Sequence, residues 1–553
     1  MPQQKRKKTS DQPGYWKRLK LRKKLNKKPK PKDSEEMMRE EIRNYLLTFD
    51  MEKLRQYALT LDRIFVLHIG PTNSGKTYDA IQALKNAESG FYLGPLRLLA
   101  LEMYDSMNED GIRCSLLTGE ESIKIPGAEH IASTIELCDY GRRVDVAIID
   151  EAQMITDRFR GDRWARAIYC VNAAEVHICL APEAEDLIIR ILDSFHADMR
   201  IVRHERLAPL EFAGPMRSVK GAKPGDALIV FSRRAVLSVA AELENSGIKA
   251  SVIYGALPPV SRREEVRRFT EGETEVVVAT DAIGMGVSLP IKRIVFCETK
   301  KYDGIKNRLL NAGEIKQIAG RAGRYGIYDK GEVLSMTDQR LVRDALKTIL
   351  PQAADITVPF PEEALDTDYP LDILMKVWNK LPPVEGFFRA DMSESLILYK
   401  NLKQEIERIC RGRKKQEIPP SVFDRQLIYK MITCPVDVKN ERLVDYWKRC
   451  CSAIFRNRPL PEPDKEEGTL EECELKYKEL DARHQLMRRI GVEEDRMEEK
   501  LDLCKKINML LALDKDRYLR HCSYCGKVLP STSSYGMCDR CYQKMQIGWF
   551  DTE

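Results

Sequence analysis

The sequence lacks the long hydrophobic runs of a membrane protein, because no stretch of about twenty uncharged apolar residues occurs among its 553 residues. It also has no short apolar core near the N-terminus of the kind that marks a secretory signal. Its apolar fraction of 43% is ordinary for a globular chain. We therefore expect no membrane partner. The length exceeds what one hydrophobic core usually organises and predicts several domains.

The sequence offers no disulfide framework either. Eleven of its fifteen cysteines are scattered, and many of them lie in apolar segments. Such a pattern indicates buried free thiols in a reducing compartment. We predict a cytoplasmic location, with the mitochondrial matrix as the alternative.

Acidic residues are nearly absent from the first 32 residues, which hold 14 Lys and Arg against the single acid Asp11. The net charge of the whole chain is only +6, so the remainder is mildly acidic. A self-repelling basic block with little apolar surface is predicted to be disordered. It is either a solubilising tail or a segment attracted to a polyanion such as RNA. A transit peptide fits less well, because the tail is rich in Lys and Pro and has few serines.

Short apolar strands alternate with helical stretches over residues 59–345, which predicts parallel sheets built from βαβ units. The predicted strands include Ile64–Ile69, Gly90–Leu93, Val144–Ile149, Val176–Leu180, Ala227–Phe231, Ala250–Ile253, Glu275–Ala279 and Ile294–Phe296. This stretch is long enough for two α/β domains, separated by the charged segment Ser218–Gly225.

Helical periodicity replaces the strand signal beyond residue 350. One heptad-like stripe predicts a core-facing helix or a hairpin with the segment after Gly491. The stripe consists of Leu470, Cys473, Tyr477, Leu480, His484 and Met487. Pro459–Gly468 is predicted to be a linker or exposed loop. The predicted parts of the chain are a basic tail (1–33), an N-terminal helical segment (34–58), a first α/β domain (59–215), a second (216–350), a helical region (351–515) and a cysteine module (516–553).

The first predicted strand runs directly into a G-x-x-x-x-G-K-T loop, and an amphipathic helix follows. The loop comprises Gly70, Pro71, Thr72, Asn73, Ser74, Gly75, Lys76 and Thr77. Its glycines allow the backbone to wrap phosphate oxygens, and the amides at the helix start complement negative charge. We expect Lys76 to reach the β- and γ-phosphates of ATP and the Thr77 hydroxyl to bind Mg²⁺.

A second motif follows the strand Val144–Ile149, whose carboxyl end delivers Asp150 and Glu151. Ligands bind at that edge of open α/β sheets. Asp150 is expected to hold Mg²⁺ through water, and Glu151 to orient or deprotonate the attacking water. An acidic pair after a strand is often only a helix cap, so the prediction depends on the phosphate loop.

A third motif lies in the second domain, where Gln317 precedes Arg321 and Arg324. The two arginines are three residues apart, which predicts one face of a short helix. Arginines from a neighbouring domain can neutralise charge on a transferred phosphoryl group.

Four cysteines near the end of the chain form C-x₂-C…C-x₂-C with twelve residues between the pairs. They are Cys522, Cys525, Cys538 and Cys541. Four thiolates in two knuckles match structural Zn²⁺, with no open coordination position. A redox C-x-x-C is the rival interpretation, without a thioredoxin-like context to support it. We interpret His521 as a neighbour of the site and not a ligand.

These motifs, in this order, resemble those of superfamily 2 helicases. The amino-acid sequences of these motifs are most similar to those of the ATP-dependent RNA helicases of the mitochondrial degradosome and their bacterial relatives. The segments that carry this resemblance are GPTNSGKT, GPLRLLA, TGEE, DEAQM, IYGALPP, VATDAIGMG and QIAGRAGR. The match covers residues 60–400 approximately. Ala152 departs from it, because family members usually have a bulkier residue there.

The resemblance implies two tandem RecA-like domains, a mostly helical C-terminal region, and ATP bound in the cleft between the domains. It assigns Lys76, Asp150, Glu151, Gln317, Arg321 and Arg324 to catalysis, and adds Asp281 and Gly284 to the nucleotide site. The nucleic-acid contacts it implies are Pro95, Arg97, Thr118, Gly119, Ser232, Arg233 and Thr280. Contacts of this kind read the backbone and not the bases, so binding is expected to be independent of sequence.

The expected function is therefore that of an ATP-dependent RNA helicase or translocase that needs ATP, Mg²⁺ and structural Zn²⁺. The resemblance implies unwinding in the 3′ to 5′ direction, RNA that is single-stranded or carries a 3′ tail, and a nuclease as a further partner. Two alternatives stay open: a DNA helicase of the same build, and a nucleic-acid-binding scaffold with a weak motor. The sequence leaves the oligomeric state undetermined.

Overall fold

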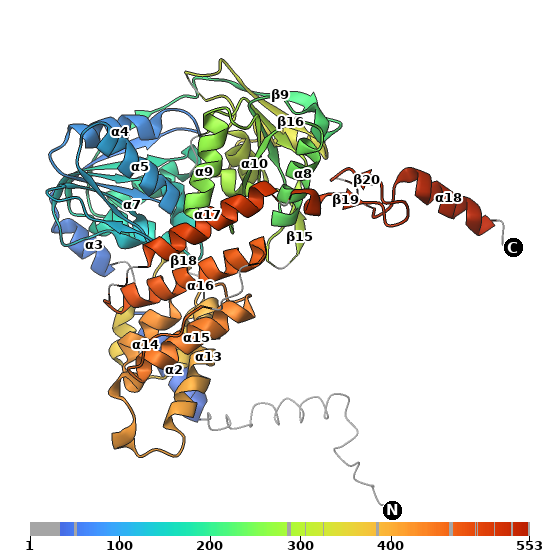
Figure 1. Ribbon diagram of the computed structural model, residues 1–553. Helices are drawn as coiled ribbons and strands as arrows, with labels where there is room; N and C mark the ends of the chain where they lie inside the picture. Colours follow the sequence, from blue (N-terminus) through green and yellow to red (C-terminus); the bar gives the residue numbers. More distant parts are fainter. Residues whose placement is uncertain are drawn as a thin grey trace, which may run out of the picture.

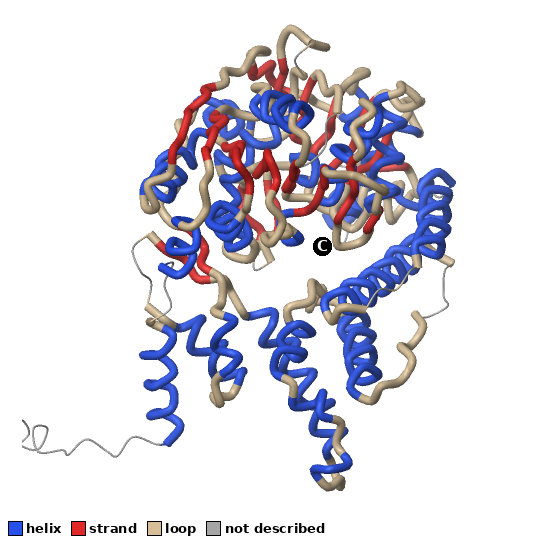
Figure 2. Tube along the Cα trace, turned by 90° about the vertical axis from the view of Figure 1, so that its left-hand side faces the viewer, coloured by secondary structure: helices blue, strands red, loops and turns tan. Residues whose placement is uncertain are grey.

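The structure is a computed structural model that describes residues 34–48, 52–284, 289–304, 306–324, 326–382, 386–463, 468–492, 494, 496–513, 515–531, 533 and 535–550. The predicted basic tail lies outside these residues. Two parallel sheets form the upper part of the molecule, and a helical region lies below them (Figure 1, Figure 2). None of the described helices combines the length and the apolar composition needed to cross a bilayer.

The first sheet has eight strands in the order β4-β3-β5-β2-β6-β7-β1-β8, all parallel to their neighbours except β4. Its strands are β1 (Ile64–Ile69), β2 (Gly90–Gly94), β3 (Cys114–Leu117), β4 (Ser122–Ile123), β5 (His130–Thr134), β6 (Val144–Ile149), β7 (Ala173–Leu180) and β8 (Asp198–Arg203). Its helices are α4 (Lys76–Asn86), α5 (Arg97–Glu109), α6 (Gly161–Cys170) and α7 (Glu185–Asp193). The central strands are buried on both faces, as the near-continuous apolar runs of parallel strands require.

The second sheet has six parallel strands in the order β11-β12-β10-β13-β16-β9. These are β9 (Leu210–Pro215), β10 (Asp226–Ile229), β11 (Ala250–Ile253), β12 (Val276–Ala279), β13 (Arg293–Phe296) and β16 (Gly331–Ser335). Helices α8 (Arg233–Glu244), α9 (Pro259–Thr270), α10 (Ala312–Ala319) and α11 (Gln339–Lys347) accompany it. A short antiparallel pair, β14 (Lys300–Tyr302) and β15 (Asn307–Leu309), extends from this domain.

The predicted alternation of strands and helices is confirmed, and three of the predicted strands have the observed bounds. The boundary predicted after residue 215 is wrong by a few residues. β9 pairs with β16 and so belongs to the second sheet. Its side chains alternate between partly buried and exposed, as expected of an edge strand, so it lacks the continuous apolar run that identified the others.

The helical region consists of α2 (Ser34–Leu46), α12 (Leu371–Lys380), α13 (Ser393–Cys410), α14 (Arg425–Ile432) and α15 (Glu441–Phe455). Its core includes the buried side chains of Trp378, Tyr446 and Trp447. The region is mostly helical, as predicted, and contains one short pair of parallel strands. β17 (Ile356–Val358) pairs with β18 (Phe387–Arg389), and Ile356 belongs to the core of the first domain.

The N-terminal helical segment predicted at 34–58 is two helices that pack in different places. Ile42 and Leu46 of α2 are fully buried in the helical region. Helix α3 (Glu52–Leu59) instead contributes Ala58 to the core of the first domain. The two helices therefore attach the N-terminal part of the chain to both the helical region and the first domain.

Helices α16 (Leu470–Arg489) and α17 (Met497–Leu513) form the predicted hairpin, which crosses the lower side of both sheets (Figure 1). Leu470, Cys473, Tyr477 and Leu480 of the predicted stripe pack on the second domain. Beyond them the stripe shifts, because Leu486, and not Met487, is buried and packs in the helical region. Beyond α17, β19 (Arg520–His521), β20 (Val528–Leu529) and α18 (Asp539–Phe550) make a small module beside the second domain.

Candidate nucleotide site and nucleic-acid face

The phosphate loop joins the end of β1 to the start of α4, at the carboxyl edge of the first sheet. Two of its glycines are needed for its shape. A Cβ on Gly70 would lie 2.7 Å from the carbonyl oxygen of His204, and Gly75 has a φ of +83°. The second value lies in the left-handed region that glycine adopts without cost. The chain can therefore curl tightly and present the amides at the start of α4 to an anion.

The side chains predicted to hold phosphate and Mg²⁺ meet at this edge. Lys76 Nζ lies 3.4 Å from the carbonyl oxygen of Pro71, and the Thr77 hydroxyl lies 3.3 Å from Asp150 Oδ1. Hydroxyl and carboxylate oxygens are the hard ligands that Mg²⁺ prefers. The donor set thus fits the cation, with Thr77 and Asp150 as the residues that would hold it.

Asp150 is held from three sides directly after β6. Tyr92 donates its hydroxyl to Asp150 Oδ2 at 2.9 Å, and the backbone amide of Glu151 donates to Oδ1 at 2.9 Å. The Trp164 indole donates to the Asp150 carbonyl oxygen at 2.9 Å. Burial, together with the charge of Glu151, raises the pKa of Asp150 to about 6. A bound cation would stabilise the ionised form.

Glu151 follows in a left-handed conformation, with a φ of +50°. The amide of Gln153 donates to one of its carboxylate oxygens, and Gln153 itself accepts from the amide of Ala181 at 3.1 Å. Burial alone would raise the pKa of Glu151, but the charges of Lys76 and Arg321 outweigh it, so its pKa is lowered. Glu151 is therefore anionic near neutral pH and can accept a proton from water.

The second domain places Arg321 opposite Glu151, with Nη2 4.0 Å from Glu151 Oε1. The same guanidinium donates to the carbonyl oxygen of Gly284 at 2.7 Å. The side-chain amide of Asn73, in the phosphate loop, donates to the Arg321 carbonyl oxygen at 3.4 Å. Arg321 is thus the cation that this domain brings to the first domain's acidic pair. Gln317 lies next to Gly284, since a Cβ built on that glycine would be 3.7 Å from Gln317 Cγ.

The prediction that Arg321 and Arg324 share one face of a helix is wrong. Helix α10 ends at Ala319, and both arginines lie in the turns that follow. Gly323 has a φ of +69°, and a Cβ there would lie 2.5 Å from the backbone nitrogen of Gly331. Close packing against β16 therefore turns the chain out of the helix before Arg324.

Arg206 was not singled out from the sequence, yet it bridges the two domains. It donates to the carbonyl oxygens of Thr72, at 2.9 Å, and Gly320, at 2.8 Å, and also to that of Ala322. One guanidinium thereby fastens the phosphate loop to the turn that carries Arg321. A single arginine in a connecting segment has no motif around it, so no sequence signal marks this role.

The remaining residues predicted for the nucleotide site lie at its edge. Asp281 begins a 3₁₀ turn after β12, is about half exposed, and pairs with Lys301 at 3.2 Å. Gly284 contributes the carbonyl group that holds Arg321. Met285 and Gly286 of the same motif lie outside the described residues.

Four of the seven residues predicted to contact nucleic acid contact α16: Arg97, Thr118, Gly119 and Arg233. Arg97, the first residue of α5, pairs with Glu120 and donates to Asp481 Oδ2 at 3.2 Å. Arg233, the first residue of α8, donates to Glu471 at 2.7 Å and to Glu474 at 3.2 Å. Carboxylates of α16 thus form ion pairs with one arginine of each domain.

Other predicted contacts are also engaged within the chain. Arg488 of α16 donates to the carbonyl oxygen of Thr118, and Gln485 lies beside Gly119. The Ser232 hydroxyl caps α8, and the Thr280 hydroxyl accepts from the amide of Ala282 at 3.3 Å. The carbonyl oxygen of Pro95 accepts from Arg160 at 2.6 Å. Ser232, Thr280 and Pro95 thus make contacts within their own domains, whereas Thr118 and Gly119 lie against α16.

Two buried histidines, His68 of β1 and His177 of β7, and the half-buried His204 directly after β8 form a chain beneath the phosphate loop. His68 Nδ1 lies 3.1 Å from His204 Nε2, and its Nε2 lies 2.8 Å from His177 Nδ1. At the ends, His177 lies 2.9 Å from Glu175, and His204 lies 3.8 Å from Asp79 of α4. Burial lowers the pKa of all three rings, that of His68 to about 4.

We expect this histidine chain to make the fold sensitive to acid. The unfolded chain takes up these protons near pH 6.5, whereas the folded chain resists protonation to lower pH. Stability therefore falls as the pH falls from about 6.5 towards 4. We expect His68 to account for about 1–2 kcal/mol of the loss, because solvent screening reduces the full value of its shift.

Urea unfolding at pH 7 and pH 5 measures this effect. His68→Asn should narrow the difference between the two urea midpoints. The control is His196→Asn, at an exposed position with a φ of +54° that Asn also adopts. An equal difference in the wild type and the His68 variant would contradict the prediction.

The four cysteines of the C-terminal module converge. Their sulfur atoms all lie within 4.8 Å of one another, and Cys525 Sγ lies 3.7 Å from Cys538 Sγ. Four thiolates around Zn²⁺ at about 2.3 Å place the sulfur atoms about 3.8 Å apart. The backbone amide of Cys538 donates to Cys522 Sγ at 3.3 Å and, as the largest cause, lowers the pKa of Cys522 to about 6. The set fits a closed structural metal site.

Comparisons with known proteins place this geometry in a family. The model of the DEXQ-box helicase domain of Suv3 matches residues 52–204, and that of the helicase conserved C-terminal domain matches residues 215–326. The Arabidopsis thaliana mitochondrial ATP-dependent RNA helicase DExH16 is 35% identical over 441 residues, which cover 77% of this chain and 75% of that protein. The chain belongs to the Suv3 family of ATP-dependent RNA helicases.

Other members of the Suv3 family are longer than this chain. The mitochondrial helicase DExH18 of Arabidopsis thaliana is 31% identical over 82% of this chain and 58% of its own length. The mitochondrial SUPV3L1 of Homo sapiens is 38% identical over 54% of this chain and 39% of its own. This chain thus spans about two fifths to three quarters of the lengths of these relatives.

The two matching family models end at residues 204 and 326, before the α16–α17 hairpin and the cysteine module. These relatives are all named as mitochondrial proteins, which gives no support to the predicted cytoplasmic location. Among solved structures, S. cerevisiae Dbp5 bound to RNA and ADP BeF3 is 15% identical, with a TM-score of 0.41 over 54% of this chain and 88% of that chain. That similarity is too low to support a conclusion about this chain.

Proposed function

We propose that this protein is an ATP-driven motor that moves along or unwinds RNA, in the 3′ to 5′ direction and without reading its sequence. The observation that carries the proposal is the meeting of Lys76, Asp150, Glu151 and Arg321 across two RecA-like domains. Each of these groups has a distinct task in phosphoryl transfer. A degenerate scaffold would be expected to have lost at least one of them.

The residues of the chain divide the reaction between them. The phosphate-loop amides and Lys76 bind the β- and γ-phosphates, and Glu151 orients a water molecule and takes its proton as the water attacks the γ-phosphorus. The bond to the ADP oxygen breaks, and ADP and inorganic phosphate leave. Mg²⁺ held by Thr77 and Asp150 would neutralise charge on the phosphates. Arg321 would complete the site only when the domains are closed, so the γ-phosphate links ATP binding to domain closure.

Four further features belong to the proposal. We propose the mitochondrial matrix as the location, supported by the names of the relatives, and a nuclease as a partner. The predicted parts of the chain remain as proposed, with β9 moved to the second domain. The basic tail is proposed to attract RNA, and deleting residues 1–32 tests this through a flatter salt dependence of RNA affinity.

The proposal is tested by the steady-state ATPase rate without nucleic acid, with single-stranded RNA, and with single-stranded DNA of equal length. Backbone contacts alone do not distinguish the two sugars unless a 2′-hydroxyl is read. Strong stimulation by RNA alone supports the proposal. Equal stimulation by DNA overturns the assignment to RNA, and no hydrolysis under any condition overturns the motor.

The contacts of α16 with both domains lead to a prediction about RNA affinity. RNA phosphates can reach Arg233 only by displacing Glu471 and Glu474. They can reach Arg97 only by displacing Asp481 of α16 together with Glu120 of the first domain. We expect the triple change E471Q/E474Q/D481N to tighten RNA binding about ten-fold, since a few partly exposed ion pairs sum to about 1–2 kcal/mol. Fluorescence anisotropy with a labelled oligonucleotide measures the change.

A matched triple variant, E109Q/D193N/E407Q, removes the same charge from three exposed positions away from α16. It should leave RNA affinity within about two-fold of the wild type, because exposed charges more than about 10 Å away are screened. Unchanged or weaker binding by the α16 variant would show that its acids do not compete with RNA.

We also propose that the cysteine module holds one structural Zn²⁺, supported by the converging sulfur atoms. Freshly purified protein should contain about one zinc per chain, and a strong chelator should remove it. Replacing Cys525 with Ser should lower the zinc content several-fold, whereas replacing the buried Cys451, which is distant in sequence, should not. Elemental analysis measures both, and protein without metal would rule out the zinc site.

A further inference from the structure

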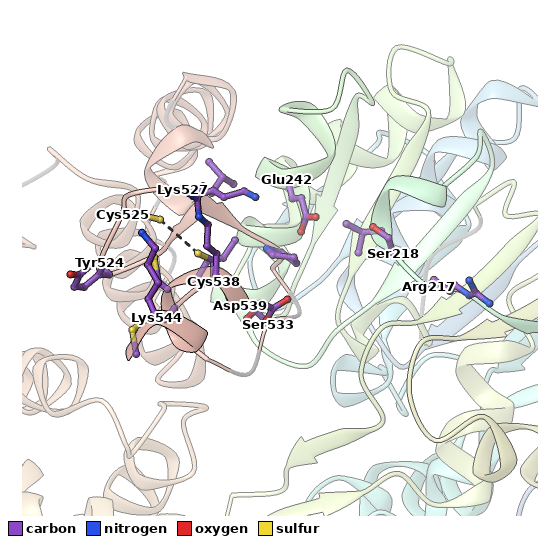
Figure 3. Close-up of a pocket in the computed structure, with 17 residues that line it drawn as sticks. Arg217, Ser218, Glu242, Tyr524, Cys525, Lys527, Ser533, Cys538, Asp539 and Lys544 are labelled. Carbon is purple, nitrogen blue, oxygen red and sulfur yellow. Dashed lines mark hydrogen bonds between the residues drawn. The ribbon is translucent and has the colours of Figure 1, made fainter. Parts of the chain in front are cut away.

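The cysteine module does not stand apart from the motor. The backbone amide of Ser531 donates to Glu242 Oε2 at 2.6 Å, and Glu242 is a buried residue of α8. A cavity of about 740 Å³ lies between the module and the second domain (Figure 3). Helix α17 crosses the motor and is followed by a 3₁₀ turn (Lys515–Tyr518) and β19, so the module lies beyond one end of the α16–α17 hairpin (Figure 1).

The cavity is lined by cations without acidic partners. Lys527, Arg540 and Lys544 of the module and Arg217 of the second domain all contribute to it, and all four are exposed. Over the described part of the chain, none of the four forms an ion pair. Of the two acids that line the cavity, Glu242 is committed to the Ser531 amide, which leaves Asp539. Four cations and two carboxylates thus line the groove, and a zinc ion held by four thiolates would itself add negative charge. What the groove presents to an anion is therefore the set of four exposed cations and not a large net charge.

Exposed aromatic rings accompany these cations. Tyr524 lines the cavity and is 78% exposed, and Tyr535 and Tyr542 are 71% and 42% exposed. The rings of Tyr535 and Tyr542 stack, with centroids 6.1 Å apart and planes at 25°. Burial would stabilise such rings, so three exposed faces on one small module offer surface for a planar ligand.

We infer that this groove binds a single strand of RNA, with Lys527, Arg540 and Lys544 on the phosphates and the exposed tyrosines stacked on bases. The inference rests on the proposed function, because it extends the track of the motor beyond its two domains. Cations that follow the backbone, combined with aromatic rings that accept any base, are the features of sequence-independent single-strand binding. An acidic peptide would satisfy the cations but not the exposed rings. A duplex keeps its bases stacked and unavailable to them.

The first test replaces the three module cations in the full chain, as K527A/R540A/K544A. The probe is a labelled 20-nucleotide oligouridylate, followed by fluorescence anisotropy at several salt concentrations. We expect affinity to fall ten-fold or more at low salt. The slope of log affinity against log salt should decrease by about 2, because each lost contact with a single strand contributes about 0.7.

The matched control, R411A/R413A/K414A, removes three exposed cations from the far end of the helical region. It should leave affinity and slope unchanged. ATPase activity without RNA and the zinc content should equal those of the wild type in both triple variants. These two readouts show that motor and module are folded.

The second test addresses the rings. Tyr524→Ala and Tyr535→Ala should each weaken oligouridylate binding about five-fold or more, and the corresponding Phe variants should bind like the wild type, because only the ring face is needed. A wild-type chain that binds no RNA would overturn the proposed function itself. A wild-type chain that binds RNA, with cation and ring variants that bind it equally well, would overturn only the groove. Loss of binding to an acidic peptide with unchanged RNA binding would assign the groove to a protein.

Discussion

Glu151→Gln is expected to slow ATP hydrolysis by about a thousand-fold while ATP still binds. A positioned base typically contributes two to four orders of magnitude. The structure gives the reason for choosing Glu151 over Asp150. The charges of Lys76 and Arg321 lower the pKa of Glu151, whereas burial raises the pKa of Asp150 and its oxygens are engaged by Tyr92 and a backbone amide. Both oxygens of Asp150 accept hydrogen bonds, whereas Gln153 donates to only one oxygen of Glu151, so we assign the proton to the other oxygen of Glu151.

Phosphate release in single-turnover experiments and equilibrium binding of a fluorescent ATP analogue measure the two parts of this prediction. Gln keeps the size and the hydrogen bonds of the side chain but cannot take a proton. Glu88→Gln, at an exposed position after α4, is the matched control and should hydrolyse ATP normally. Hydrolysis at the wild-type rate by the Glu151 variant would assign the base to another residue.

Arg321→Ala is expected to reduce the turnover number by about three orders of magnitude with little change in ATP affinity. An arginine supplied from a neighbouring domain stabilises charge that develops mainly in the transition state, and such arginines contribute 10³-fold or more. Arg321 lies 4.0 Å from Glu151 and is held by the carbonyl oxygen of Gly284, which aims it across the domain boundary.

Arg321→Lys should not restore activity, because an ammonium group lacks the planar fork of a guanidinium. Arg324→Ala is the companion variant, since Arg324 was predicted to share this task. It should also lower turnover by about three orders of magnitude if it contacts the γ-phosphate. Steady-state kinetics with saturating RNA separate the turnover number from KM. A variant of Arg321 that loses ATP affinity but keeps its turnover number would show a role in binding alone.

The motor could be predicted from the sequence because its elements are local. Gly70 and Asp150 each come directly after a buried strand, which places them at the carboxyl edge of a parallel sheet. The order and spacing of the motifs along the chain then predict which elements surround the nucleotide. The four cysteines likewise carry their geometry in their spacing. In each case the structure of the site is determined by residues that are close together in the sequence.

The features that could not be predicted depend on contacts between distant segments. Arg206 reaches Gly320 over 114 positions of sequence, and Arg97 reaches Asp481 over 384. From sequence alone, an arginine or an aspartate on a helix that pairs with a distant residue cannot be distinguished from one that is exposed to solvent. β9 joins the second sheet because β16 offers it an edge, and α10 ends before Arg321 because Gly323 must pack on Gly331. Tertiary neighbours decide these positions.

The ion pairs of α16 change how ionic strength acts on the motor. A free arginine that binds RNA releases the cations condensed on the phosphates, which makes affinity fall steeply as salt rises. If RNA binds at Arg97 and Arg233 as we propose, it exchanges with carboxylates of the same chain, and the freed acids attract cations back from solution. Part of the ion release is thereby cancelled. The hairpin thus acts as a built-in counterion, which keeps RNA affinity steadier over a range of salt concentrations than the number of arginines alone would allow.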